Sequence, residues 1–148
     1  MRAEADGHLP VSPDEAWSVL LRWEDQARWI RDAVSVRVLS PHRDGPGVRI
    51  AVKSRVFNVP LFTEELEVTR WEPPHVLEMT HRSFIRGVGT WALEAEGIGS
   101  RLRWSEDLSL PLPVLGELAL LVYRPFLRRL MRGALRDLSA HLRSGSAR

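Results

Sequence analysis

The chain has 148 residues, 44% of them hydrophobic and 27% charged, which suits one globular domain with a sizeable core. It has no cysteine, which excludes disulfides, thiolate nucleophiles, zinc–thiolate sites and iron–sulfur clusters. The net charge is +2, although the pI is about 9.9 because Lys53 is the single lysine among 21 basic residues and arginine does not lose its proton.

The first segments predict a strand followed by two short helices. Residues Arg2–Leu9 can form a strand. Ser12 is suited to cap a helix that has Pro13 at its first position, and Glu15 completes a capping box. A second short helix or turn is expected over residues 23–30, where apolar residues recur at helical spacing.

From Ala33 onward, apolar and polar residues alternate with the period of a half-buried strand. Turn residues at 44–47, 73–74 and 97–100 separate the runs. The expected strands cover residues 33–39, 48–53, 62–71, 76–81, 88–95 and 101–110. Short strands joined by tight turns favour an antiparallel meander over parallel crossovers.

Residues 114–142 show the period of a long amphipathic helix. Its expected apolar stripe consists of Leu118, Val122, Phe126, Leu127, Leu130, Met131, Leu135, Leu138 and Leu142. Pro125 is expected to kink this helix or to start a second one. Such a helix has to cover the apolar face of the sheet. The sequence therefore predicts an α+β domain over residues 1–143, in which a curved antiparallel sheet of six to seven strands wraps around the C-terminal helix, and a frayed tail over 144–148.

Several short motifs carry a resemblance to a known superfamily. They are residues 11–17 with Trp29, residues 72–74, residues 89–93, residues 99–106 and the long C-terminal helix. Together they resemble the START and polyketide cyclase-like (SRPBCC) superfamily, the helix-grip fold shared with the birch pollen allergen. This resemblance spans nearly the whole chain and implies a deep cavity between sheet and helix. Members bind lipids, sterols, polyketides or plant hormones, and some are aromatase/cyclases, so the fold does not choose among functions.

Glu106 is the most informative polar residue, because it shares one face of its strand with Leu102, Trp104 and Leu108. A carboxylate among apolar groups is expensive unless it is paired or its pKa is raised. Glu106 is therefore a candidate polar anchor or general acid/base. The alternatives are a buried ion pair near the cavity end and an edge position open to water.

His81 is in phase with the apolar residues of its own strand and is expected to face inward at the cavity mouth. With turns near residues 83 and 98, Glu106 lies opposite Trp91, whereas His81 lies near Gly87. These positions are about four residues apart along the middle strand, or ~13 Å. We therefore expect no direct contact between His81 and Glu106.

Aromatic residues are the remaining candidates for the cavity wall. Trp91 and Trp104 come from central strands and Phe126 from the helix, and Tyr123 beside it can offer a hydroxyl to a ligand carbonyl. The alternative is that most aromatics simply fill the core. The candidate ligand-binding residues are Met79, His81, Trp91, Trp104, Glu106, Val122, Tyr123 and Phe126, and the candidate catalytic residues are Glu106, His81 and Tyr123. Residues 57–62 are either a hydrophobic lip at the cavity entrance or a bulged strand.

Arg124, Arg128, Arg132 and Arg136 recur every four residues, with Arg129 beside them. This row is either a solvated helix face or a contact surface for anionic lipid or an acidic partner. Nucleic acid is not expected, since no exposed aromatics interleave with the arginines and no recognised module is present. The other histidines show no ligand spacing, so neither a metal nor a cofactor is expected.

These observations rank three functions. The first is binding or carrying a small apolar ligand (a lipid, polyketide or aromatic compound) by a cytoplasmic monomer or homodimer. The second is a polyketide aromatase/cyclase or dehydratase that uses polar residues of the cavity. The third is an interaction module whose arginine row makes weak contact with a membrane surface or an acidic partner.

Overall fold

The computed structural model describes residues 1–56 and 59–146. Its elements are β1 (Arg2–Leu9), α1 (Pro13–Leu20), the 3-10 helix η1 (Trp23–Arg28), β2 (Ala33–Val38), β3 (Arg49–Val56), β4 (Val59–Glu72), β5 (Val76–Arg82), β6 (Arg86–Glu96), β7 (Gly99–Ser109) and α2 (Leu115–Ser146). The turn residues identified in the sequence separate these strands, so the predicted elements are found in the predicted order.

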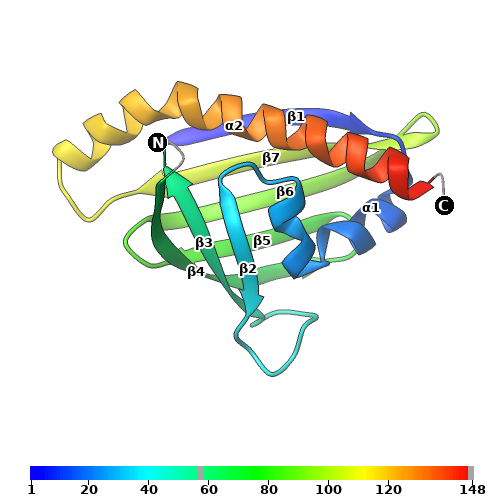
Figure 1. Cartoon of the computed structure of the whole chain (residues 1–148), viewed down its shortest axis with the longest axis horizontal. Coiled ribbons are helices and arrows are strands. Elements are labelled where there is room, and N and C mark those ends of the chain that lie inside the picture. Colours follow the sequence, from blue (N-terminus) through cyan, green and yellow to red (C-terminus); the bar gives the residue numbers. More distant parts are fainter. Residues whose placement is uncertain (57–58, 147–148) are drawn as a thin grey trace.

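The seven strands form one antiparallel sheet in the order β1-β7-β6-β5-β4-β3-β2. From β2 to β7, strands that follow one another in the chain are neighbours in the sheet. β1 pairs with β7 and forms the opposite edge from β2. The sheet is strongly curved, and α2 runs across its open side along β1 and β7 (Figure 1). This is the helix-grip α+β fold that the sequence predicts.

Local sequence explains how α1 is placed. Ser12 is the N-cap, and its hydroxyl accepts a hydrogen bond from the backbone N–H of Glu15 at 3.3 Å. Pro13 follows at the start of the helix, where a missing N–H costs nothing. The buried face of α1 includes Trp17, whose ring meets that of Trp71 from β4 edge-on at 5.3 Å. α1 and η1 therefore close one end of the curved sheet.

The inner face of α2 differs from the predicted apolar stripe at its N-terminal end. Leu120, Met131 and Leu138 are buried, whereas Leu118 and Val122 are exposed. The prediction for these two residues is wrong because a row of every fourth residue drifts by ~40° per step around a helix. A row that faces the sheet by residue 130 therefore begins on the outer side at residue 118.

Two further features of α2 concern Pro125 and the C-terminal end. Of the two alternatives for Pro125, it does not start a second helix, because it lies inside a single helix that spans Leu115–Ser146. The helix continues through Ser146, into the predicted frayed tail of residues 144–148, and residues 147 and 148 lie outside the described residues. Of the segment 57–62, residues 57 and 58 also lie outside, and the remainder belongs to β4.

The core lies between the concave face of the sheet, α1, η1 and the C-terminal two thirds of α2. Trp23 and Trp29 are almost completely buried there, together with Leu102 and Met131. In the part of the chain that the structure describes, no helix combines the length and the apolar character needed to cross a membrane.

Candidate functional site

A cavity of about 150 Å³ lies between the concave face of the sheet and the middle of α2. Most of its wall is apolar. The apolar lining residues are Ile30, Ala33, Ile50, Val52, Phe62, Leu66, Leu77, Met79, Ile85, Trp91, Trp104, Leu108, Leu127, Leu130 and Met131. The polar ones are Gln26, Asp32, Ser54, Arg55, Glu64, His81, Glu106 and Tyr123.

Three of the polar residues form a continuous hydrogen-bonded cluster on the sheet side of the cavity. The Nδ1 atom of His81 lies 2.8 Å from Oε1 of Glu64, and its Nε2 atom lies 3.0 Å from Oε2 of Glu106. The indole N–H of Trp104 donates to Oε1 of Glu106 at 2.9 Å. All three members of the Glu64–His81–Glu106 cluster are largely buried, with side-chain exposures of 8 to 13%. Both ring nitrogens of His81 are therefore engaged by carboxylates.

The contact between His81 and Glu106 contradicts the prediction that they lie too far apart. Glu106 pairs with Gly89 rather than with Trp91, while His81 pairs with Gly87 as expected. The cause is the tight β6–β7 turn, in which Glu96 pairs with Gly99, one residue short of the assumed turn. When the centre of the turn shifts by one residue, the residue of β6 that lies opposite Glu106 shifts by two, from Trp91 to Gly89.

Gly89 is what allows Glu106 to reach across β6 to β5. A Cβ atom at position 89 would lie 2.8 Å from both carboxylate oxygens of Glu106. The missing side chain therefore leaves the space that the Glu106 carboxylate occupies on its way to His81. The same arrangement places Trp104 beside Trp91, whose rings meet edge-on at 5.9 Å.

The charges of the cluster follow from its surroundings. Burial alone would lower the pKa of His81, but the hydrogen bonds and charges of Glu106 and Glu64 outweigh burial and raise this pKa to about 10. At neutral pH His81 is therefore an imidazolium that donates both of its N–H groups. Such an imidazolium cannot accept a proton, and it does not readily release one at neutral pH.

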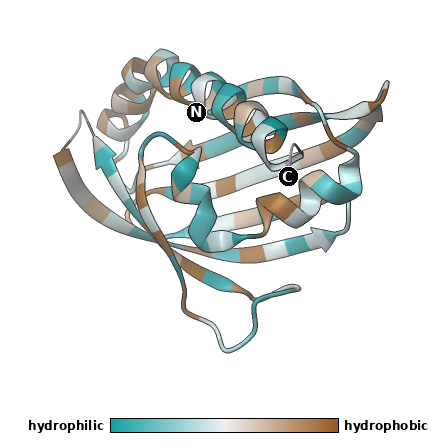
Figure 2. Ribbon diagram, turned by 45° about the vertical axis from the view of Figure 1, so that its right-hand side comes forward, coloured by the Kyte–Doolittle hydropathy of each residue, from teal (hydrophilic) through white to brown (hydrophobic). Residues whose placement is uncertain are grey.

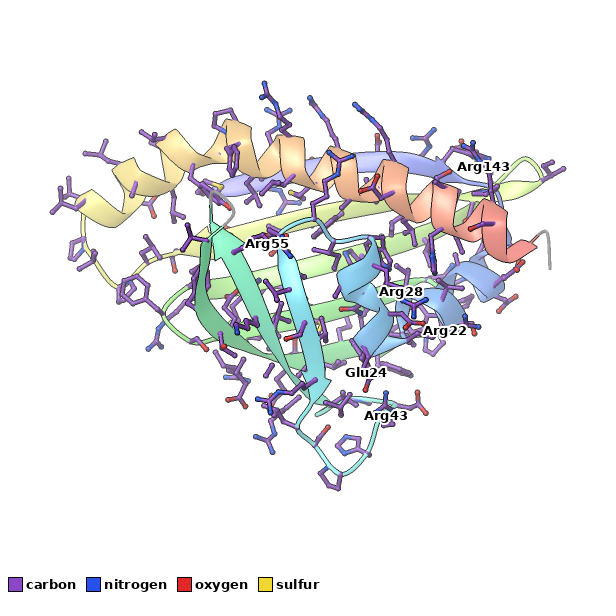
Figure 3. All side chains as sticks on the ribbon, viewed as in Figure 1. Arg22, Glu24, Arg28, Arg43, Arg55 and Arg143 are labelled. Atoms are coloured by element: carbon purple, nitrogen blue, oxygen red, sulfur yellow. The ribbon has the colours of Figure 1, made fainter. Side chains whose placement is uncertain are left out.

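A second polar group lies at the edge of the cavity. Burial raises the pKa of Asp32, and the charges of Glu64 and Glu106 raise it further, while a backbone hydrogen bond and Arg55 act in the opposite direction. Burial likewise raises the pKa of Tyr123 to about 12. The Tyr123 phenol is therefore protonated at neutral pH and can donate a hydrogen bond. Arg55 lies between β3 and α2 (Figure 3).

The predicted ligand-binding residues separate into two groups. Met79 and Trp91 line the cavity, as do His81, Trp104, Glu106 and Tyr123. The prediction for Val122 is wrong, because its side chain is 80% exposed on the outer face of α2. Phe126 does not line the cavity either, and its ring packs 5.6 Å from that of Tyr123.

Sequence reasoning missed Glu64, Asp32 and Arg55. Glu64 had a usable signal, because it is in phase with the inward-facing Leu66 and Val68 of the same strand. Asp32 precedes β2, and Arg55 lies near the end of β3 next to a register shift, so period-two alternation could not place either side chain. Within the described residues, no group of three or more potential ligand side chains is arranged to hold a metal ion.

Comparisons with known proteins agree with this fold. Residues 2–143 match the family described as "Polyketide cyclase / dehydrase and lipid transport". TTHA0849 from Thermus thermophilus is 19% identical with a TM-score of 0.81, and the match covers 99% of each chain. A START superfamily protein from Mycobacterium smegmatis is 13% identical with a TM-score of 0.71, covering 97% of each chain.

A third solved structure is the di-domain ARO/CYC StfQ from the steffimycin biosynthetic pathway. It is 16% identical with a TM-score of 0.76, and the match covers 99% of this chain but 52% of the StfQ chain. No curated protein matches the chain. At these identities the solved structures establish the fold and leave the ligand to be argued from the cavity itself.

Proposed function

Because the chain belongs to the polyketide cyclase/dehydrase and lipid transport family, we propose that it binds a small, mainly apolar ring compound in the cavity beneath α2. The observation that carries this proposal is the cavity of about 150 Å³ with an apolar wall and one polar side. Family membership makes ligand binding the starting expectation, and the dimensions of this cavity support a small ligand.

The volume of the cavity favours the smaller ligands among the classes that the family binds. An apolar cavity of about 150 Å³ is the size that accepts benzene, whereas sites for drug-sized ligands occupy about 300–1,000 Å³. A long-chain lipid or a four-ring polyketide does not fit unless the wall moves. A compound with one ring or two fused rings fits without such a movement.

The polar groups specify where such a ligand carries its heteroatoms. Glu64 and Glu106 present carboxylate oxygens, which accept from a ligand hydroxyl or N–H. The Tyr123 phenol can donate to a ligand oxygen, and the Asp32 carboxyl, whose pKa burial raises, lines the same space. A phenol or a hydroxylated aromatic carbonyl compound therefore matches both sides of the cavity.

The test is a size series of ligands, measured by thermal shift and calorimetry on the full chain. We expect phenol and indole to bind and to raise the midpoint of unfolding, and palmitate and a four-ring polycycle to do neither. Phenol should bind more tightly than benzene, because only phenol can donate to the carboxylates. Tight binding of palmitate or the polycycle, with no binding of the small compounds, would contradict the proposal.

A matched pair of variants locates the binding site. Leu127→Trp places an indole at the cavity wall, whereas Leu121→Trp makes the same change on the exposed face of α2. We expect the first variant to weaken binding of indole by about tenfold or more and the second to leave it unchanged. Equal affinities in the two variants would place the ligand elsewhere.

A second candidate function is proton transfer on the bound compound. It is favoured by Asp32, a carboxyl of raised pKa in an apolar cavity, with the protonated Tyr123 phenol lining the same space. The His81 imidazolium holds Glu64 and Glu106 in place and is not the base in this scheme. Deuterium incorporation next to the carbonyl of a bound aromatic ketone, measured by NMR in D₂O, tests it. Asp32→Asn should abolish the exchange and retain binding, whereas Glu96→Gln on the surface should change neither.

A further inference from the structure

The N-terminal turns of α2 present apolar side chains to solvent. Leu115, Leu118, Leu121 and Val122 are 53 to 80% exposed, and Val114 directly before the helix is also exposed. We call residues 114–122 the α2 tip. It projects beyond the sheet at one end of the molecule (Figure 1), and apolar colouring is concentrated in these first turns (Figure 2). A contiguous exposed apolar patch of this kind indicates a contact surface.

The outer face of α2 changes from apolar to basic directly after the tip. The arginines on this part of the helix are Arg124, Arg128, Arg129, Arg132 and Arg136, of which all but the half-buried Arg128 are exposed. Among the described residues, none of these five forms an ion pair, whereas Arg31, Arg43 and Arg82 pair with carboxylates at 2.6 to 2.8 Å. The single acid between residues 114 and 136 is Glu117, which lies 3.9 Å from the N-terminal amino group.

Two acids that share a groove with several of these arginines are already engaged. The groove between α2 and β1 contains Glu4 and Asp6 beside the arginine side chains. Glu4 pairs with Arg2 at 2.7 Å, and Asp6 lies 3.5 Å from Arg101. The basic face of α2 therefore keeps its positive charge, and its partner has to supply the negative charge.

We propose that the α2 tip and the arginine row together dock the protein on an anionic lipid surface. At 1.5 Å per residue, residues 114–122 extend over about 12 Å and residues 124–136 over about 18 Å along the helix. Apolar side chains of an interfacial helix enter the boundary of headgroups and acyl chains to a depth of ~5–10 Å, which the side chains of the α2 tip can reach. The arginines nearest to the tip then lie at the level of the lipid phosphates, which guanidinium groups bind bidentately.

Charge and polarity favour lipid over two other occupants. A second copy of the chain packed through this face would bring two unpaired arginine rows together, which is repulsive. An acidic protein would neutralise the arginines but would leave the apolar tip without a counterpart. An anionic bilayer has negatively charged headgroups next to an apolar layer. The apolar α2 tip matches the apolar layer, and the arginines that follow it match the headgroups. Tyr123 and Leu127 follow the tip on the inner face, so the docked end is also the end at which α2 covers the cavity.

The test uses the full chain with vesicles of phosphatidylcholine alone or with about one third phosphatidylglycerol. We expect binding to the anionic vesicles, weak binding to the neutral ones, and release at high salt. Arg124→Gln with Arg132→Gln should weaken binding by about 30-fold. Leu118→Ser with Val122→Ser should weaken it by about tenfold or more. All four side chains are exposed, so the fold should be retained, as circular dichroism would check.

Matched controls lie at the far side of the molecule. Arg22→Gln with Arg28→Gln removes the same charge near η1 (Figure 3), and Ile98→Ser removes an exposed apolar residue from the β6–β7 turn. We expect both controls to bind vesicles as the original protein does. Three results would overturn the proposal: no binding to anionic vesicles, equal losses in the controls, or self-association that the tip substitutions abolish in the absence of vesicle binding. Binding to an acidic polypeptide but not to vesicles would also overturn it.

Discussion

The buried cluster of Glu64, His81 and Glu106 should make the protein less stable as the pH rises into the alkaline range. The pKa of His81 is about 10 in the folded protein and 6.5 in the unfolded chain. A group whose pKa is higher in the folded state stabilises the fold fully below pH 6.5 and loses this contribution as the pH rises through about 10. We therefore expect the free energy of unfolding to fall between pH 7 and pH 9.

The size of the effect follows from the two pKa values. At ~1.4 kcal/mol per pKa unit, the whole contribution is about 5 kcal/mol, and about 2 to 3 kcal/mol of it is lost between pH 7 and pH 9. Few other side chains titrate in this window, because the chain has no cysteine, one lysine and one tyrosine, and the pKa of Tyr123 is about 12. Urea unfolding followed by tryptophan fluorescence at pH 7, 8 and 9 measures the change directly.

A pair of substitutions separates the cluster from general effects of alkali. Glu64→Gln removes one partner of His81 and should lower the pKa of His81, so that stability depends less on pH. Glu96→Gln removes the exposed partner of His8 and should leave the dependence unchanged. The reasoning is refuted if the His81 ring titrates near 6.5 by NMR, or if the free energy of unfolding is flat between pH 7 and pH 9.

Three further predictions concern single positions. Gly89→Ala should displace the Glu106 carboxylate, lower the pKa of His81 in an NMR titration and reduce stability by about 1–3 kcal/mol. Asp32→Asn should raise the free energy of unfolding at pH 7, since burial disfavours the charged carboxylate; a lower value in urea unfolding would show that the charge is paired. Val114→Gly should raise the midpoint of thermal unfolding by relieving the strain of a β-branched residue at φ 59°, and an unchanged midpoint would argue against that strain.

The fold was predictable because it depends on patterns that repeat many times. Alternation from Ala33 onward fixes which side chains face inward, and turn residues divide the strands. The periodicity of residues 114–142 similarly requires a long helix over the sheet. Each of these features is supported by many residues, so single exceptions such as Pro125 do not change the outcome.

The site was less predictable because it depends on single residues. Alternation places Glu106 on the inner face but does not fix its partner, which a one-residue difference in the β6–β7 turn moves from Trp91 to Gly89. The contact with His81 further requires a glycine at position 89, whose role is visible only once the register is known. Asp32 lies outside the strands, where no period applies.

Stability alone does not account for the cluster, and this bears on function. A buried ion pair is commonly neutral or unfavourable compared with apolar side chains of the same volume, because removing charges from water is expensive. An apolar trio in place of Glu64, His81 and Glu106 could fill this part of the core without the cost of removing charges from water. Such a trio would not provide the fixed hydrogen-bond acceptors that the carboxylates of Glu64 and Glu106 present to a cavity of about 150 Å³. Under the proposed function, in a space sized for one or two rings, these acceptors would distinguish a hydroxylated ring from a hydrocarbon of the same shape.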